Sequence, residues 1–498
     1  MTAEPQYTDD EVQYSGDNKV ERSVNFVHTQ VTLGMDKNER TFVRLNDEAG
    51  NPTCYPLNGQ DFRNWLQYHA YQHGDVLKAE DLSEIQSQLN AYARFEGEKM
   101  VVHLRAAQVD ENTVELDCAD DDNIRVRLAA GEVTILKFGS EVLFYQSPTQ
   151  QPLTIPAAEG NWRALLPFLN MAEQEKLLFI GWLTYILAHP RGKSVGYPVL
   201  VVKGEQGAGK SFLCKSIVRG LVDPNLSGIQ LFPKDPKDLV ISSQNAHVLI
   251  YDNLRKLTKE WSDVLCIAAT QGTLSTRKLY TDSDENVMHL HAPVVLNGIH
   301  NFVEEPDLAS RCLNIQLHPM DAERREHEAV LETRLNNSLP SIFRGLLELA
   351  AKGLQIADQT EVIHPERMLG YVRWLAALEQ IMELPAGELQ LAYRHNLSQT
   401  MLDTIQENLL AYTVLKFAKN YIDVPWQGRP QDLLTTLEAH APRRLRSHTS
   451  QWPQNAISLS KRLSALHKAL TAQGVKLQLG ERGKHRQITI GYEPPENS

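Results

Sequence analysis

The sequence of 498 residues lacks the features that mark membrane and secreted proteins. It contains no run of about 18 apolar residues, the length that a membrane-spanning helix requires. Residues 1–10 are polar and acidic, without the basic and apolar regions of a signal peptide. Hydrophobic residues make up 42% and charged residues 22%, which is typical of globular proteins. We therefore expect a cytoplasmic protein with no membrane partner.

Cysteine is scarce and dispersed. None of the five cysteines belongs to a CxxC pair. Such short spacings are typical of structural zinc sites, and dense disulfide frameworks are typical of small secreted chains. The sequence therefore predicts buried free thiols rather than a zinc site or a disulfide framework. The five positions are Cys54, Cys118, Cys214, Cys266 and Cys312.

The chain has no overall excess of positive charge, since its formal net charge is −12. An acidic protein is in general a poor partner for nucleic acid. The charge is unevenly distributed, however, because residues 442–490 hold ten Lys and Arg against the single acid Glu481. This asymmetry predicts a polyanion-binding module attached to an acidic body.

Hydrophobic periodicity divides the chain into successive parts. After residue 160, four short apolar runs alternate with helical stretches, which indicates a parallel sheet covered by helices on both faces. Phe26–Leu33 is expected to be a strand, because β-branched residues cluster there. The predicted parts are an acidic tail (1–23), an α+β domain without a chemical motif (24–155), an α/β core (160–320, opening with a helical segment to 190), a helical lid or bundle (321–424), a linker (425–442) and a basic winged-helix-like module (442–492).

A phosphate-binding pattern follows the first apolar run of the core. Residues 204–211 match GxxxxGK[ST] between a strand-like run and a helical run, which is the context that a P-loop requires. The glycines let backbone N–H groups face phosphate oxygens at a helix N-terminus. Lys210 should reach the β- and γ-phosphates of ATP, and Ser211 should ligate Mg²⁺. The predicted nucleotide contacts are Gly204, Glu205, Gln206, Gly207, Ala208, Gly209, Lys210, Ser211 and Phe212.

Three polar residues at the ends of later apolar runs extend the predicted ATPase site. Asp252 ends one run and is expected to be the metal-side acid. Asn253 follows it at the position of the usual base, and an amide can orient water but cannot accept its proton. Hydrolysis is therefore slow, or the base comes from elsewhere. Asn297 could position the attacking water, although an ordinary turn-forming Asn before Gly298 is the alternative.

Arg311 lies fourteen residues after Asn297. An arginine at this point could reach the γ-phosphate bound by a neighbouring subunit and act as an arginine finger. The alternative is an ion pair with Asp307 on the same helical face.

The motifs GEQGAGKS, LIYDN, CIAATQGTLSTRKLYTDSDE, APVVLNGI and PDLASR follow one another over residues 160–320. This series resembles AAA+ ATPases of phages, plasmids and integrated elements, and more broadly the superfamily-three helicases. The resemblance implies a hexameric ring, with Lys210, Ser211 and Asp252 at the nucleotide and metal, Asn297 as sensor and Arg311 as finger. No primase-like domain precedes the core, so priming is not implied.

Two groups of basic residues are predicted to contact DNA. Arg277 and Lys278 correspond to the channel hairpin of superfamily-three rings, although the acids that follow leave a basic pair without a DNA role as the alternative. An amphipathic helix over Leu459–Leu470 and two later strand-like runs indicate a winged helix that binds DNA or a protein. Its expected phosphate contacts are Lys461, Arg462, Arg482, Lys484 and Arg486.

Together these patterns predict an ATP- and Mg²⁺-dependent, ring-forming DNA motor, with a replicative helicase or initiator of a mobile element as the first interpretation. Single-stranded or forked DNA is its expected substrate, and residues 24–155 are a candidate docking domain for replication or defence proteins. Two alternatives stay open. One is a slowly hydrolysing ATP switch that serves as a DNA-bound scaffold or loader, and the other is the ATPase of an anti-phage defence or transposition system.

Overall fold

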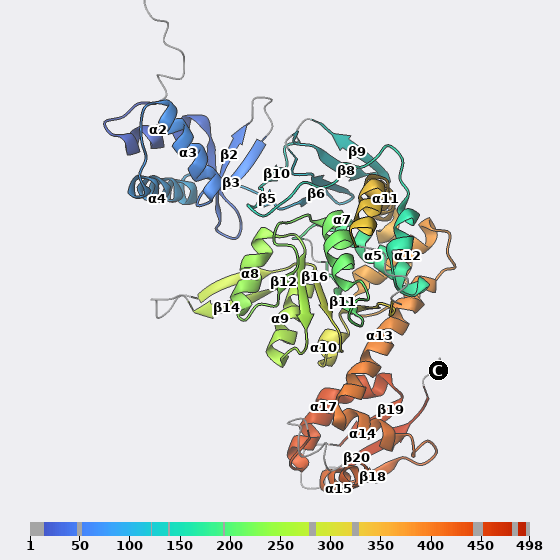
Figure 1. Cartoon of the computed structure of the whole chain (residues 1–498). Coiled ribbons are helices and arrows are strands. Elements are labelled where there is room, and N and C mark those ends of the chain that lie inside the picture. Colours follow the sequence, from blue (N-terminus) through green and yellow to red (C-terminus); the bar gives the residue numbers. More distant parts are fainter. Residues whose placement is uncertain are drawn as a thin grey trace, which may run out of the picture.

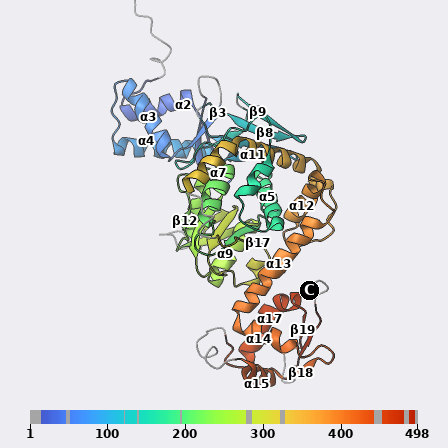
Figure 2. The ribbon, with the colours of Figure 1, turned by 45° about the vertical axis from the view of Figure 1, so that its right-hand side comes forward.

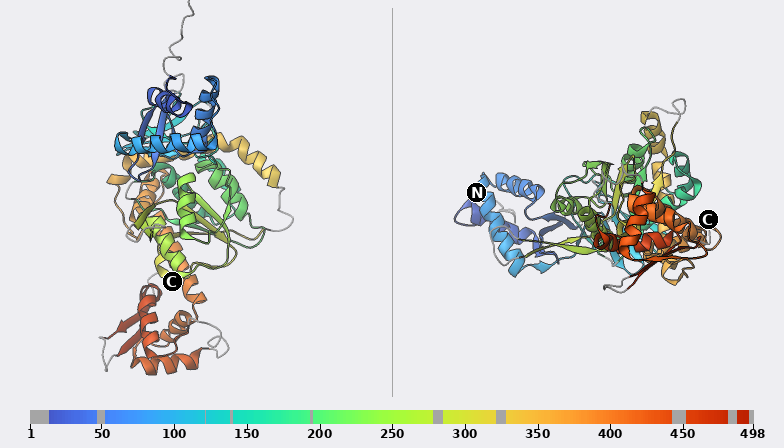
Figure 3. Two further views of the ribbon diagram at one scale, coloured as in Figure 1. Left: turned by 90° about the vertical axis from the view of Figure 1, so that its left-hand side faces the viewer. Right: turned by 90° about the horizontal axis from the view of Figure 1, so that it is seen from below.

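A computed structural model describes residues 14–46, 52–120, 122–137, 140–192, 195–277, 285–320, 328–441, 452–480 and 487–494 (Figure 1). The chain builds an N-terminal unit, an antiparallel meander, a parallel sheet with its helices, and a C-terminal unit. The C-terminal unit is set apart from the other three and is joined to them by one long helix (Figures 2 and 3). Within the described ranges, no helix is long and apolar enough to cross a membrane.

The N-terminal unit packs three helices on a four-stranded sheet with the order β3-β2-β1-β4. Leu82, Ile85 and Leu89 recur at helical spacing and lie in its core with Phe62. The helices are α2 (Lys19–Gln30), α3 (Gln60–Gln72) and α4 (Ala79–Phe95). The strands are β1 (Thr32–Met35), β2 (Thr41–Asn46), β3 (Pro52–Pro56) and β4 (Glu98–Lys99).

Two predictions for this unit are wrong. Phe26–Leu33 is not one strand, because α2 runs through to Gln30 and is capped by Asn18, whose Oδ1 accepts the N–H groups of Val20 and Glu21. The predicted tail over 1–23 also ends too late, since Tyr14 stacks on His73 with ring centroids 4.3 Å apart. Residues 1–13 lie outside the described part of the chain.

The antiparallel meander shares its core with the parallel-sheet part of the molecule. Val114, Leu116, Val126 and Leu128 are buried in the same hydrophobic cluster as residues of the long helix α11 (Glu328–Ile356). The predicted domain over 24–155 therefore divides into two cores. The strands are β6 (Ala106–Asp110), β7 (Thr113–Asp117), β8 (Arg125–Ala129) and β9 (Glu132–Leu136), with the short parallel pair β5 (Val102–His103) and β10 (Leu143–Phe144) beside them.

The central sheet has five parallel strands in the order β12-β13-β16-β11-β17, so the predicted parallel sheet is confirmed. Along β11, Val199 and Val201 enter one hydrophobic core while Leu200 and Val202 enter the other. Burial on both faces explains why these strands are continuous apolar runs. The strands are β11 (Val199–Lys203), β12 (Gln230–Leu231), β13 (Leu249–Leu254), β16 (Val294–Gly298) and β17 (Cys312–Gln316).

Helices cover both faces of this sheet, and a hairpin extends from it. The hairpin pairs β14 (Gly272–Arg277) with β15 (Glu285–Leu290). All five cysteines of the chain are buried and free. The main covering elements are the 3-10 helix η1 (Trp162–Phe168) and the helices α5 (Glu173–Ala188), α8 (Pro236–Asn245), α9 (Lys259–Thr270), α10 (Pro306–Ala309) and α12 (Leu369–Ile381).

Helix α13 (Glu388–Glu407) runs along the edge strand β17 and leads to the C-terminal unit. The Asn396 amide accepts the Asn314 N–H at 3.0 Å and donates to the Asn314 carbonyl at 2.6 Å, so it covers groups that an edge strand would leave unpaired. The Lys203 Nζ donates to Asp403 Oδ2 at 2.8 Å. The same helix therefore contacts both β17 and the last residue of β11.

In its described residues, the C-terminal unit has a three-stranded antiparallel sheet with the order β18-β20-β19 and three helices. The predicted linker over 425–442 is wrong, because Leu433 and Leu437 are buried in the same core as Leu459 and Leu463. The elements are α14 (Leu409–Ala418), β18 (Trp426–Gly428), α15 (Pro430–His440), α17 (Ala456–Ala472), β19 (Val475–Leu479) and β20 (Ile488–Tyr492).

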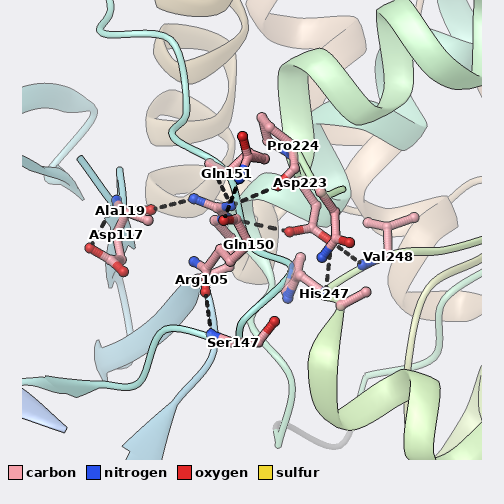
Figure 4. Close-up of polar contacts among 12 residues, drawn as sticks. Arg105, Asp117, Ala119, Ser147, Gln150, Gln151, Asp223, Pro224, His247 and Val248 are labelled. Atoms are coloured by element: carbon pink, nitrogen blue, oxygen red, sulfur yellow. Dashed lines mark hydrogen bonds and ion pairs between the residues drawn. The ribbon is translucent and has the colours of Figure 1, made fainter. Parts of the chain in front are cut away.

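A buried polar cluster fastens the meander to the central sheet (Figure 4). Arg105 is 1% exposed and donates to Asp223 Oδ1 at 3.3 Å and to the carbonyls of Asp117, Gln151 and Pro224. Asp223 also accepts from Arg219 at 3.0 Å. The backbone N–H groups that precede β13, at 247 and 248, donate to the same carboxylate at 2.7 and 3.1 Å. Asp223 thus forms ion pairs with two buried guanidinium groups and joins three segments that lie apart in the sequence.

Removal of this carboxylate should be costly. We expect Asp223→Asn to destabilise the protein by about 3–5 kcal/mol, because two buried arginines lose their counter-charge. The midpoint of urea denaturation, followed by tryptophan fluorescence, measures the effect. Asp263→Asn is the matched control, since Asp263 lies 3.8 Å from Lys259 in an exposed pair, and it should leave the midpoint unchanged. Equal midpoints for both variants would contradict a stabilising role for the cluster.

Three histidines, of which His247 is buried and His103 and His291 are partly buried, predict a loss of stability in mild acid. Burial lowers the pKa of His103 and of His291 to about 4, and it lowers the pKa of His247 well below its usual value. In the unfolded chain these groups titrate near pH 6.5, so between about pH 6.5 and 4 the unfolded state binds more protons. As the pH decreases through this window, the free energy of unfolding therefore decreases by up to about 1.4 kcal/mol per pH unit for each group. His291→Gln should flatten the pH dependence of the urea midpoint, and a profile parallel to that of the wild type would contradict this.

Candidate functional site

The loop over residues 204–211 joins the carboxyl end of β11 to a helix that continues to Val222. This helix consists of α6 (Lys210–Phe212), a π-helical turn η2 (Leu213–Arg219) and α7 (Gly220–Val222). π-helical turns of this kind occur frequently at functional sites. The helix therefore begins inside the predicted motif and leads directly away from it.

Three glycines allow this loop its shape. Gly207 and Gly209 have φ angles of +82° and +93°, which side chains with a Cβ rarely adopt. A Cβ at Gly204 would lie 3.1 Å from the Leu317 Cβ, so glycine also permits close packing on the segment after β17. A tight loop ahead of a helix N-terminus presents N–H groups and positive partial charge, an arrangement that binds anions.

Lys210 lies over this loop. Its Nζ donates to the carbonyl of Gly204 at 2.7 Å and to that of Glu205 at 2.9 Å. Partial burial lowers the pKa of Lys210, while the nearby charge of Asp252 acts in the opposite direction. The ammonium group is thus held at the mouth of the loop, on the side where Asp252 lies.

Asp252, Asn253 and Asn297 meet at the carboxyl ends of neighbouring strands. The pairing of β13 with β16 shifts register between Tyr251 and Leu254, which places Asp252 and Asn253 in a bulge. Asn253 has a φ of +59°, and its N–H donates to Asn297 Oδ1 at 3.2 Å. The bulge thus fixes the backbone at Asn253, the position at which a catalytic base is usual.

Asn297 is fully buried and also contacts the helix that follows the loop. Its Nδ2 donates to Cys214 Sγ at 3.6 Å. Burial raises the pKa of the Cys214 thiol to about 12, so this sulfur stays protonated at neutral pH. The Asn297 amide therefore links the bulge on β13 to the helix after the loop. The Asn297 side chain thus fixes the distance between the bulge on β13 and the helix after the loop.

The position of the loop in the sheet agrees with its predicted role. From β11 the chain crosses to β12 on one side and returns through β13 and β16, and β17 then pairs on the other side of β11. Ligands of open α/β sheets bind outside the carboxyl ends of the strands where the strand order reverses in this way. The loop over 204–211 and Asp252 both lie at this edge.

Arg311 lies at the opposite end of the sheet from the loop, where the amino ends of the parallel strands meet. Its carbonyl accepts the Val199 N–H at the start of β11, whereas the loop follows the end of that strand. Its side chain is 10% exposed and forms an ion pair with Asp307 at 2.6 Å. The ion pair of Arg311 with Asp307, which is the alternative to an arginine finger, is thus present within one chain. One strand length separates Arg311 from the loop over residues 204–211 of the same chain.

The predicted DNA contacts lie on two other elements or outside the described residues. Arg277 is the last residue of β14. On α17, Lys461 is exposed and Arg462 is half-buried. Outside the described residues are Lys278, Arg482, Lys484 and Arg486.

Sequence reasoning missed several residues that support the loop. Asn170 donates to the Ala208 carbonyl at 3.2 Å and to the His318 carbonyl at 2.8 Å, so it ties the loop to the segment after β17. Asp403 holds Lys203, as described above. No short motif could have shown these links, because the partners lie 38, 148 and 200 residues apart.

Comparison with known proteins gives matches of unequal weight. No curated protein matches the chain. A solved apo structure of the NrS-1 C-terminal region aligns with 12% identity and a TM-score of 0.39, covering 94% of this chain and 98% of the other. A second structure of that region aligns with 12% identity and a TM-score of 0.32, covering 96% and 100%. Similarity at this level supports no conclusion about fold or function.

Two family models match with more specific consequences. The model of an actinomycete integrative conjugative element replication protein matches residues 163–403, and the model of the RepA C-terminal domain of these elements matches residues 410–498. The boundary between the two models lies between residues 403 and 410, an interval that contains Asn408 between α13 and α14. The models describe adjoining parts of one kind of protein and span almost all of residues 163–498, so this part of the chain is similar to the replication proteins of actinomycete integrative conjugative elements.

Proposed function

We propose that this replication protein is an ATP-dependent, ring-forming DNA motor that acts as a helicase or initiator of its element. The observation that carries the proposal is the convergence of the loop over 204–211, Lys210 and Asp252 at the strand-order reversal of a parallel sheet. This convergence supports a P-loop ATPase of the AAA+ type, in which the first strand ends at the phosphate loop and another strand carries the metal-side acid.

The residues at this edge fit ATP with Mg²⁺. Ser211 is exposed and Asp252 is half-buried, so a hydroxyl and a carboxylate oxygen are accessible, and Mg²⁺ prefers such hard ligands. When bound, Mg²⁺ would neutralise charge on the phosphates. Lys210 now donates to two loop carbonyls, and a phosphate oxygen would replace these weaker acceptors. Gly207 and Gly209 have positive φ angles, which let the loop turn tightly around a phosphate.

In the proposed hydrolysis, amide and charged side chains orient the attacking water. No carboxylate base follows Asp252 to take the proton of that water. Asn253 follows Asp252 and is exposed, but its amide cannot accept a proton. Asn297 engages Asn253 and Cys214, so it positions the bulge beside the predicted phosphate site. This arrangement favours slow turnover, and it makes a nucleotide switch that loads or anchors other proteins on DNA the second candidate function. Similarity to these replication proteins favours either function over the defence or transposition alternative.

Arg311 supports assembly into a ring. It lies about one strand length, roughly 13–16 Å, from the loop of its own subunit, because β17 has five residues that each rise about 3.3 Å. An arginine finger at this position can therefore serve only the nucleotide of another subunit. A closed ring, with a hexamer as the proposed form, supplies such a neighbour to every subunit.

The C-terminal unit supports an action on DNA. Its described elements follow one another in the order α14-β18-α15-α17-β19-β20, which supports the proposal of a winged helix. The exposed face of α17 carries Ile457, Lys461, Ser464 and Ala465, and small side chains on this face would allow close approach to a groove. We propose that Lys461 and Arg462 contact phosphates. Arg277 in the β14–β15 hairpin is the proposed contact of the ring channel.

The ATPase proposal is tested most simply at Lys210. We expect Lys210→Ala to lower ATP turnover at least about 100-fold, because the charge that holds the β- and γ-phosphates is lost. Release of inorganic phosphate with and without single-stranded DNA measures the effect. Lys215→Ala is the control, since Lys215 is 63% exposed on the same helix and should leave turnover within about twofold of the wild type. Equal turnover in the wild type and Lys210→Ala would refute the site. Turnover without unwinding of a forked duplex would favour the switch over the helicase.

The DNA proposal is tested at Lys461. We expect Lys461→Ala to weaken DNA binding and to reduce the slope of log affinity against log salt by about one, because one phosphate contact disappears. Fluorescence anisotropy with a labelled duplex at several salt concentrations measures both quantities. Lys352→Ala is the matched control, since Lys352 is exposed on α11 and should change neither quantity. Identical salt slopes for Lys461→Ala and the wild type would remove α17 from the interface.

A further inference from the structure

Asp307 is held by two arginines at the edge of the sheet opposite the loop. Arg311 lies 2.6 Å from its Oδ2, and Arg367 lies 2.6 Å from its Oδ1. Arg311 also donates to the Asp307 carbonyl at 2.8 Å, and Arg367 donates to Ser310 Oγ at 3.3 Å. The two guanidinium groups therefore converge on one carboxylate although they lie 56 positions apart in the sequence.

The group carries more positive charge than its carboxylate neutralises, and part of it is accessible. The side chains of Asp307 and Arg367 are 54% and 38% exposed, whereas that of Arg311 is 10% exposed. The Arg311 Nε is buried and has no hydrogen-bond partner among the described residues. Forked guanidinium donors match the oxygens of a phosphate, which can bind two arginines at once. The exposed carboxylate occupies the position that such an anion would take.

The location of the two arginines decides whether they could contact a phosphate bound by their own chain or by a second copy of it. The group adjoins the start of β17, while the loop of the same subunit adjoins its end. A rigid strand lies between them, so neither arginine reaches its own loop without unfolding the edge of the sheet. A phosphate that meets this group belongs to a second copy of the chain.

We propose that Arg367 is a second arginine that acts, together with Arg311, on the γ-phosphate of ATP bound by the neighbouring subunit, with Asp307 holding both side chains in place until that phosphate arrives. This inference rests on the proposed ATPase function. In hydrolysis, the water oxygen bonds to the γ-phosphorus, and the bond to the β–γ bridging oxygen breaks. The electron pair of that bond stays on ADP, and the water proton passes to the released phosphate. The two guanidinium groups stabilise the negative charge that develops on the transferred group.

The test compares Arg367→Ala with a matched exposed arginine. Arg394 is 41% exposed and forms a 2.6 Å ion pair with Glu366, next to Arg367 in the sequence. We expect Arg367→Ala to lower kcat at least about 100-fold, as loss of an arginine finger does, and to leave the Kd of a fluorescent ATP analogue within about twofold. Retained binding shows that the variant is folded. Arg394→Ala should keep kcat within about twofold of the wild type, and Arg367→Lys should fall between the two because it keeps the charge but not the fork.

Mixing two inactive variants tests whether the arginine acts on a neighbour. Lys210→Ala subunits have a defective loop and an intact Arg367, and Arg367→Ala subunits have the reverse. We expect the mixture to turn over more ATP than the sum of the separate variants, because some interfaces pair an intact loop with an intact arginine. A mixture no more active than the sum overturns the proposal, as does a kcat of Arg367→Ala equal to that of Arg394→Ala. If the wild type is no more active than Lys210→Ala, the proposed function itself fails, and this inference falls with it.

Discussion

The parallel alignment of β11, β16 and β17 is the constraint on which the rest of the account depends. Because parallel strands point the same way, their carboxyl ends meet at one edge, and there the glycine loop, Asp252 and Asn297 come together. Their amino ends meet at the other edge, where Arg311 and Asp307 lie. One strand length thus separates the glycine loop from the arginines. The separation makes each subunit incomplete by itself if both groups act on one phosphate.

Buried polar contacts hold this sheet to the parts around it. Asp223 connects the meander to β13 through Arg105 and Arg219, both nearly inaccessible to solvent. On the other side, Lys203 and Asp403 connect β11 to α13, which continues towards the C-terminal unit. Buried charges are tolerated only with such partners, and loss of either partner lowers the free energy of unfolding. The strand that ends at the loop is therefore tied by an ion pair to the helix that leads to the C-terminal unit.

The elements that the sequence predicted well are those with a local signal. The apolar runs at β11, β13, β16 and β17 indicated a parallel sheet because both faces of each strand are buried, and the glycine pattern marked the loop that follows β11. The prediction of a mobile-element replication protein is likewise confirmed by the family models. Wrong predictions arose where tertiary contacts outweighed local composition, as at Phe26, which is buried on the helix α2. The pair of Asp307 with Arg367 could not be predicted, because only the fold brings residues 60 positions apart together.

The central claim is that an ATP site is completed by two subunits. A structure of the protein with Mg²⁺ and a non-hydrolysable ATP analogue tests it most directly. The account predicts a ring in which the phosphates lie on the loop over 204–211 and Arg311 of an adjacent subunit faces the γ-phosphate. A nucleotide bound at this loop in a monomer, with no second subunit at the γ-phosphate, would contradict it.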